Sequence, residues 1–360
     1  MAEELTDFGN FERVIPEAIH RPSSIDELVE RMARNNIDGI PTTLRGHGCT
    51  VRGQTLGSNI IDLKGINHID FNEESLEITV GAGTTFDQIF TELLPEYRVP
   101  IFPNNPGQQI TAGGYASAGG LGFFSPTSGG FPYYVKSLLL VTMTGEKIRC
   151  SRNENQEIFN YALGGAGRIG AIVELTLGVI HSGSHVGYAV LPYLDFDALI
   201  RDSEKALRNS NFDSVLTSKQ IASNSLSRKL TGGIYSLNLI KEIESEDDSR
   251  EFHQEVGKIR RGPFRMFTKD DDLNDDWAHK LKLSMRYTLA SMGNLVYSHP
   301  NVYHGDNVVR PWVDLIVPMS KHKEFYKIAE RIIKEEGMQN YILSLDPFGG
   351  FLKVPAFGSY

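Results

Sequence analysis

An α+β fold in two domains is predicted for this chain of 360 residues. Hydrophobic residues recur at helical spacing in some segments and at strand spacing in others, without regular alternation. A hydrophobic content of 40% is enough to form a sizeable core. The glycine-containing stretch that begins at His181 interrupts both patterns, so we place residues 1–181 in the first domain and 182–360 in the second.

The first domain opens with two predicted helices. Ser24 is the expected N-cap of a helix over 25–35, with Glu27 three residues later as a capping box requires. A second helix is expected over 86–94, capped by a threonine and closed by Pro95. The remaining elements are a helix over 154–163 and strands near 60–61, 69, 76–80, 136–144 and 171–177.

The second domain is predicted from the same patterns. Helices are expected over 199–209, 247–258 and 321–336, and strands over 232–239, 312–317 and 341–345. The acidic runs 242–248 and 270–272 are predicted to be solvated loops.

Charge and composition exclude several classes of function. The net charge of −9 gives no electrostatic support for nucleic-acid binding. No stretch of about 20 apolar residues is present that would span a membrane. The chain has only Cys49 and Cys150 and an acidic start without an apolar signal region, so we expect a cytoplasmic protein without disulfides and without a metal site.

The run Arg45-Gly46-His47-Gly48-Cys49-Thr50 is the most informative motif. Glycines at alternate positions bring successive backbone N–H groups together in a nest that suits an anion such as a pyrophosphate. The same run also fits an ordinary tight loop with an exposed arginine.

Residues 99–135 contain no charged residue and no histidine, but many glycines and aromatic residues. A disordered linker of this length would be charged and poor in apolar residues. We interpret the stretch as backbone laid against a large flat ligand. The alternative is a buried, turn-rich core segment.

A third glycine cluster runs from Gly164 to Gly170 and matches the dinucleotide fingerprint by its letters. That fingerprint needs a strand before it and a helix after it. Here a helix pattern precedes the glycines and a strand pattern follows them, so we reject a nicotinamide-binding site.

Taken in order, these motifs resemble the flavin domain of the vanillyl-alcohol-oxidase and p-cresol-methylhydroxylase (PCMH) superfamily, most closely that of cytokinin dehydrogenases. The resemblance covers residues 12–180 and is carried by 23–28, 45–54, 59–63, 79–85, 111–120 and 163–172. It implies a PCMH-type FAD-binding domain of two subdomains, followed by an α+β substrate (cap) domain, with FAD as the cofactor.

The resemblance also implies which residues hold the cofactor. The residues expected at the pyrophosphate and adjacent groups are Gly46, His47, Gly48, Thr50 and Gln54, and those at the flavin or its ribityl chain are Thr111, Ser117, Leu121 and Ile172. Family members carry a covalently bonded histidine where this chain has Cys49. We therefore expect noncovalent FAD, with a thioether to Cys49 as the alternative.

The substrate side departs from the family pattern. Cytokinin dehydrogenases carry an aspartate base where this chain has Pro106, and proline cannot act as a base. Trp312 and Asp314 match cavity-lining positions, and alternation along a strand puts them on one face. His304 beside Asp306 is a further candidate base, and a polar loop is the alternative for that pair.

These features predict an FAD-dependent oxidoreductase that oxidises an alcohol or amine carbon of a small to medium metabolite by hydride transfer to flavin N5. Two alternatives stay open: a non-redox flavoprotein that binds or cyclises a metabolite, and a cytokinin dehydrogenase with a displaced base. We find no counterpart of the family's C-terminal flavin-contacting segment, so a partner subunit or a second copy of the chain is a candidate to cover the flavin.

Overall fold

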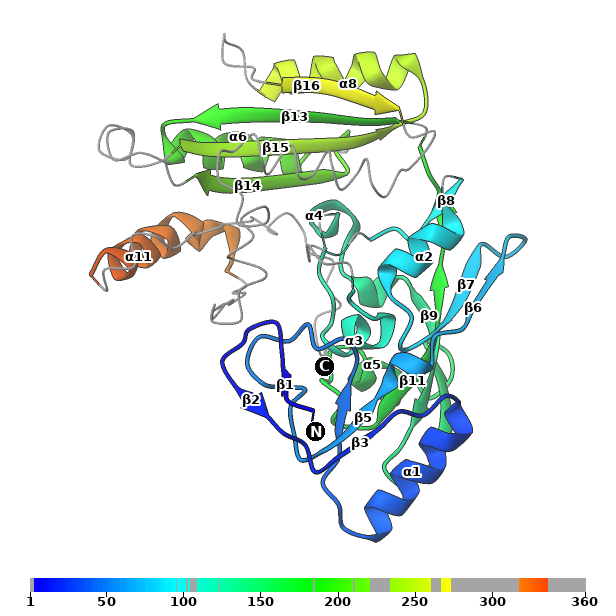
Figure 1. Ribbon diagram of the computed structural model, residues 1–360. Helices are drawn as coiled ribbons and strands as arrows, with labels where there is room; N and C mark the ends of the chain where they lie inside the picture. Colours follow the sequence, from blue (N-terminus) through cyan, green and yellow to red (C-terminus); the bar gives the residue numbers. More distant parts are fainter. Residues whose placement is uncertain are drawn as a thin grey trace. The chain divides into compact units, whose positions relative to one another are not determined.

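The fold is described from a computed structural model. It covers residues 3–94, 96–101, 103, 109–122, 124–183, 185–209, 211–220, 234–259, 267–272 and 317–335. These residues form two compact units (Figure 1). Unit 1 contains residues 3–122 and 130–181, and unit 2 contains 124–129 and the described residues from Ser182 onward.

Unit 1 is built on two sheets. The larger is antiparallel, in the order β10 (Lys147–Ser151), β9 (Val135–Val141), β11 (Ala171–Gly178), β7 (Glu77–Gly81) and β6 (Ile69–Asn72). The smaller is parallel, in the order β3 (Ala18–His20), β5 (Asn59–Asp62) and β4 (Thr43–Arg45). Two short antiparallel pairs complete the unit, β1 (Leu5–Thr6) with β2 (Arg13–Val14), and β8 (Tyr97–Arg98) with β12 (Ile180–His181).

Helix α1 (Ile25–Ile37) joins the two sheets through a common core. Ser24 Oγ accepts the N–H of Glu27 at 3.2 Å, which confirms the predicted cap. The Glu27 carboxylate accepts the N–H of Ser23, one residue earlier than a capping box has it. The buried face of α1, Leu28 and Met32, packs with residues of β5, β9 and β11.

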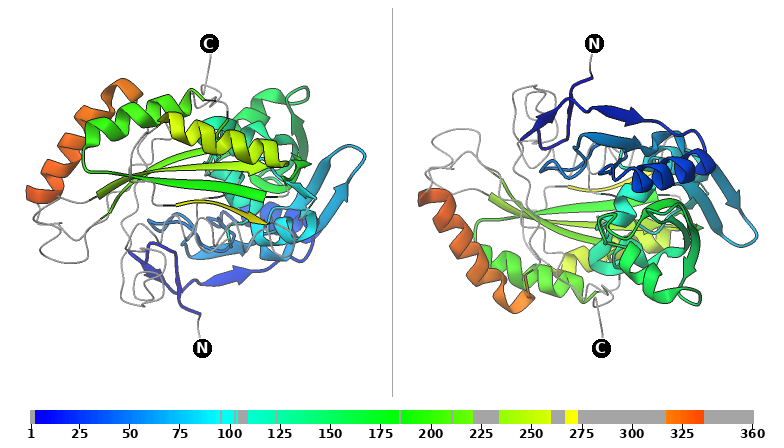
Figure 2. Two further views of the ribbon diagram at one scale, coloured as in Figure 1. Left: turned by 90° about the horizontal axis from the view of Figure 1, so that it is seen from above. Right: turned by 90° about the horizontal axis from the view of Figure 1, so that it is seen from below.

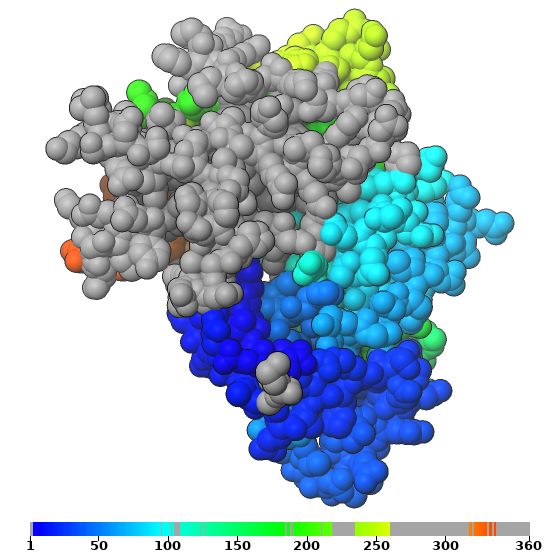
Figure 3. All heavy atoms as spheres, in the orientation of Figure 1, coloured from blue at the N-terminus to red at the C-terminus, as the bar shows by residue number. Residues whose placement is uncertain are grey.

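The other helices of unit 1 are short. Helix α2 (Phe86–Leu93) starts with a complete capping box between Thr85 and Gln88. Further elements are α3 (Ala112–Ser117), α5 (Gln156–Ala162) and the 3-10 turns η1 (Leu63–Gly65) and η2 (Phe131–Tyr133). In the space-filling view, the N-terminal part of the chain, coloured blue to cyan, forms a continuous surface of unit 1 (Figure 3).

Unit 2 is a four-stranded antiparallel sheet with helices on one face. The strand order is β14 (Ser214–Gln220), β15 (Ile234–Ile243), β13 (His185–Tyr193) and β16 (Phe267–Asp272). Helices α6 (Phe196–Leu207) and α8 (Glu246–Ile259) lie on the same face of this sheet (Figure 2), where alternate residues of β13 and β15 form the core. The remaining elements are α4 (Ser125–Ser128), η3 (Met319–Lys321) and α11 (His322–Glu335).

The structure confirms the α+β class and corrects two details. Residues 270–272, predicted as a loop, end the edge strand β16, because pairing with β13 satisfies their backbone. Residues 246–248 form the first turn of α8, where negative charge is favourable. Strands β13 and β14 were not predicted. The predicted strand 341–345, and all of 312–317 except Val317, lie outside the described residues.

The described residues contain no helix long and apolar enough to cross a membrane. In the same part of the chain, no group of three or more His, Cys, Asp or Glu side chains is placed to hold a metal ion.

The buried hydroxyl of Tyr115 leads to a prediction about the stability of the protein. Its ring lies 5.0 Å from the rings of Phe86 and Phe131, and among the described residues its buried hydroxyl has no hydrogen-bond partner. Tyr115→Phe is therefore expected to leave the free energy of unfolding unchanged or to raise it by about 1 kcal/mol. Denaturant unfolding of the FAD-free protein measures this.

Tyr193→Phe is the matched control, because the Tyr193 hydroxyl donates to Asp202 at 2.7 Å. This variant is expected to lose about 1–3 kcal/mol. A loss of that size for Tyr115→Phe would contradict the prediction.

Candidate functional site

The glycine loop, residues 46–53, follows strand β4 and turns sharply at Gly48. Gly48 has φ of +73°, in the left-handed region that favours glycine. A Cβ at this position would lie 2.2 Å from Nη2 of Arg45, so the space is closed to a side chain as well. The sequence therefore needs glycine at 48 for both conformation and packing.

The loop leaves backbone donors unused. Within the part of the chain that the structure describes, no hydrogen bond uses the N–H groups of His47, Gly48 or Cys49. A residue with positive φ next to residues with negative φ brings successive N–H groups together in an anion nest. The loop thus has the donor set expected from the sequence.

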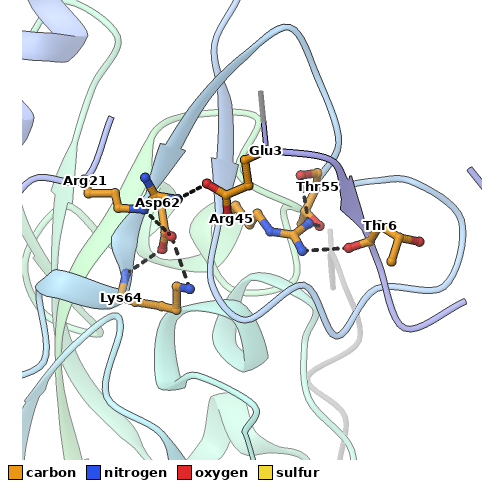
Figure 4. Close-up of polar contacts among 7 residues, drawn as sticks. All are labelled: Glu3, Thr6, Arg21, Arg45, Thr55, Asp62 and Lys64. Carbon is orange, nitrogen blue, oxygen red and sulfur yellow. Dashed lines mark hydrogen bonds and ion pairs between the residues drawn. The ribbon is translucent and has the colours of Figure 1, made fainter. Parts of the chain in front are cut away.

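Arg45, the residue just before the loop, is hydrogen-bonded to other parts of unit 1. Its guanidinium donates to the Thr6 carbonyl at 2.7 Å and to Thr55 Oγ1 at 3.1 Å (Figure 4). Burial lowers its pKa, and Asp62 and Asp7 oppose that effect. The alternative interpretation expected an exposed arginine, whereas Arg45 is half-buried and hydrogen-bonded to Thr6 and Thr55.

Two of the predicted cofactor residues use their side chains in hydrogen bonds within the protein, Thr50 in a partly buried position and Gln54 at the surface. Thr50 Oγ1 donates to the Asp7 carboxylate at 2.9 Å and lies 3.0 Å from Thr55 Oγ1. Gln54 Oε1 accepts the N–H of Arg52 at 2.8 Å. Asp7 is the residue that sequence reasoning missed at this loop, because no local pattern marks its role.

The second glycine segment meets the glycine loop at Thr111. A Cβ added to Gly46 would lie 2.5 Å from Thr111 Oγ1, so the Thr111 side chain packs directly on the backbone of the loop. The same hydroxyl caps α3 by accepting the N–H of Gly114 at 3.3 Å. Gly114 is exposed while its neighbours Gly113 and Tyr115 are buried.

The third glycine cluster binds the end of α3. Gly164 N–H donates to the Ala116 carbonyl and Ala166 N–H to the Ser117 carbonyl, both at 2.8 Å. The cluster lies between α5 and β11, which confirms the order that excluded a nicotinamide-binding fingerprint. Three clusters far apart in the sequence are therefore adjacent in unit 1.

The last two predicted flavin contacts lie close to α3. Ile172 is buried in β11, the strand against which α3 packs. Leu121 is half-buried beyond the end of α3 and approaches Gly130. The aromatic residues Tyr115, Phe124 and Phe131 are buried in the protein's own core, as the alternative interpretation of residues 99–135 has it.

The pKa shifts of His47 and Cys49 both favour the neutral form of the side chain. Partial desolvation, followed by the charge of Lys64, lowers the pKa of the His47 imidazole. Lys64 pairs with Asp62 at 3.2 Å (Figure 4). Burial raises the pKa of the Cys49 thiol, although the charge of Arg45 opposes this. Near neutral pH, Cys49 is a thiol rather than a thiolate.

The candidate catalytic residues lie outside the described part of the chain. These are His304, Trp312, Asp314 and the proline at the family's base position, Pro106.

Comparisons with known proteins agree with this geometry. A family model described as an FAD binding domain matches residues 16–151, which include the glycine loop and Thr111. This match and the relatives below support the FAD-linked oxidase family for this chain. FAD is accordingly its cofactor, and the predicted resemblance to the PCMH-type FAD-binding domain is confirmed.

Three relatives illustrate the similarity. An uncharacterized oxidoreductase of the Rhodococcoides fascians fasciation locus is 24% identical over 340 residues, 92% of this chain and 71% of that protein. Cytokinin dehydrogenase 2 of Arabidopsis thaliana is 27% identical over 209 residues, 57% of this chain and 42% of that enzyme. An FAD-linked oxidoreductase of Penicillium janthinellum is 27% identical over 160 residues, 44% of this chain and 35% of that protein. The chain thus spans less than half of the last two relatives.

The residues present fit FAD. The unpaired amides of residues 47–49 suit a pyrophosphate, which helix ends and nests bind without a cation. The exposed backbone at Gly114 offers a surface without side chains beside Thr111.

Gly114→Val tests this fit. Within 4 Å, an added Cβ would meet only Thr111 Oγ1, at 2.9 Å, so the protein is expected to fold. If FAD packs on this backbone, the branched side chain is expected to weaken FAD binding roughly tenfold or more. Flavin fluorescence titration measures the affinity, with thermal unfolding of the FAD-free variant as the control. A variant that retains FAD through gel filtration as the parent does would contradict the assignment.

Proposed function

We propose that this FAD-linked oxidase family member oxidises an alcohol or amine carbon of a small to medium metabolite. The observation that carries the proposal is the nest of free amides at residues 47–49, set against Thr111 inside a matched FAD-binding domain. Bound FAD supplies the hydride acceptor, at flavin N5.

Cofactor binding and substrate binding are assigned to the two predicted domains. Residues 1–181 hold the cofactor, with Gly46, His47, Gly48, Cys49, Thr50 and Gln54 at the pyrophosphate and adjacent groups. The predicted contacts at the flavin and its ribityl chain are Thr111, Ser117, Leu121 and Ile172. Residues 182–360 supply the substrate side. The two free cysteines support a cytoplasmic site of action.

The proton acceptor is the part of the proposal that separates it from cytokinin oxidation. With Pro106 at the family's base position, a base must come from elsewhere, and His304 and Asp314 are the candidates with Trp312 as a cavity wall. Cytokinin dehydrogenases of Arabidopsis thaliana and Oryza sativa are among the relatives, so cytokinins belong in any substrate panel.

The visible spectrum of the purified protein is expected to show bound flavin, because the nest and the matched domain provide its site. Anaerobic mixing with a panel of alcohols, amines and cytokinins is then expected to bleach the flavin absorbance with an alcohol or amine, and poorly with cytokinins. Rapid bleaching by cytokinins would establish the displaced-base alternative. A bound flavin that no compound in a broad panel bleaches would favour the non-redox alternative.

FAD is expected to be noncovalent, because burial keeps Cys49 protonated and a thiol is a weak nucleophile. Acid or heat denaturation should release all of the flavin, and mass spectrometry should find the unmodified chain. Cys49→Ser is the control and should bind FAD like the parent. A flavin adduct on Cys49 would overturn the noncovalent assignment.

A further inference from the structure

Residues 5–14 form a short hairpin that we name the N-terminal clasp. β1 pairs with β2 through Leu5 with Val14 and Thr6 with Arg13. The match to the FAD-binding domain begins at residue 16, after the clasp, and the clasp belongs to the same compact unit.

The clasp binds the carbonyl side of the glycine loop. Phe8 N–H donates to the Gly48 carbonyl at 2.9 Å, and Gly9 N–H donates to the Thr50 carbonyl at 3.1 Å. The fit is close, since a Cβ on Gly9 would lie 1.9 Å from the Val51 carbonyl oxygen.

Asp7 completes the attachment from inside the clasp. Its side chain is buried, with 4% of the residue exposed. One carboxylate oxygen accepts from Thr50 Oγ1 at 2.9 Å and from Gly53 N–H at 2.7 Å, and the other accepts Asn10 N–H at 3.1 Å. Hydrogen bonds to a charged acceptor are stronger than neutral ones, and they offset the cost of burying the carboxylate.

The geometry of the peptide group relates the carbonyls that the clasp binds to the N–H groups on the opposite side of the loop. In a trans peptide, the carbonyl of one residue and the N–H of the next point in opposite directions. Because the clasp holds the Gly48 and Thr50 carbonyls, the N–H groups of Cys49 and Val51 point away from it. Neither N–H has a hydrogen-bond partner among the described residues.

We propose that the N-terminal clasp positions the glycine loop and, through the Gly48 carbonyl, the Cys49 amide of its pyrophosphate-binding nest, and that Asp7 is the positioning residue for FAD. The inference rests on the proposed role of the glycine loop. Asp7 does not touch the cofactor. It fixes the loop with its carbonyls turned to the clasp, so that the amides are already oriented when FAD arrives.

Asp7→Ala is the test. The variant leaves two loop donors, Thr50 Oγ1 and Gly53 N–H, without their acceptor, so FAD affinity should fall roughly tenfold or more, about 1.4 kcal/mol per tenfold. Flavin fluorescence titration measures this. Hydrogen exchange of the FAD-free protein provides a second readout and should show faster exchange for residues 47–51 in the variant. Asp7→Asn keeps the acceptor for two of the three donors and should fall between the variant and the parent.

Ser24→Ala is the matched control, because it removes the cap of α1, and among the described residues no hydrogen bond joins Ser24 to the glycine loop. It should lower the melting temperature and leave FAD affinity unchanged. If Asp7→Ala fails to fold, Asp7→Asn decides the question by the same titration. A folded Asp7 variant with the FAD affinity and loop exchange of the parent would overturn the positioning role. A parent that takes up no FAD would instead overturn the cofactor site itself.

Discussion

A peptide group presents its carbonyl on one side and the next N–H on the other, and the site depends on this constraint at residues 46–53. The chain uses the carbonyl side for itself, through Phe8 and Gly9, and leaves amides unpaired on the opposite side. Arg45 and Asp7 hold the loop from behind. Side chains in this region therefore serve mainly to fix the backbone, whose amides are the proposed binding groups.

This arrangement has an electrostatic consequence. The Arg45 guanidinium donates to Thr6 and Thr55, and Lys64 is paired with the buried Asp62 (Figure 4). A pyrophosphate at the loop would meet neutral amide dipoles, which act over short distances and in fixed directions. Affinity based on such donors depends on loop geometry more than on net charge, in keeping with a chain whose net charge is −9.

Local signals in the sequence predicted the local features well. The cap of α1, the threonine cap of α2 and the glycines between α5 and β11 each follow from residues a few positions apart. The contacts that hold the loop were not predictable, because Asp7 and Thr50 are 43 positions apart and neither stands in a periodic pattern. The acidic end of β16 was misassigned for a similar reason, since pairing with β13 outweighs the composition of the segment.

The position of β11 has a consequence for how unit 1 is made. This strand is the middle one of its sheet, between β9 and β7, yet it is nearly the last part of the unit to be synthesised. A nascent chain that ends before residue 171 carries two separate strand pairs, β9 with β10 and β6 with β7, each with an unpaired edge. Such edges are open to wrong pairing, and they are removed only when β11 pairs with both β9 and β7.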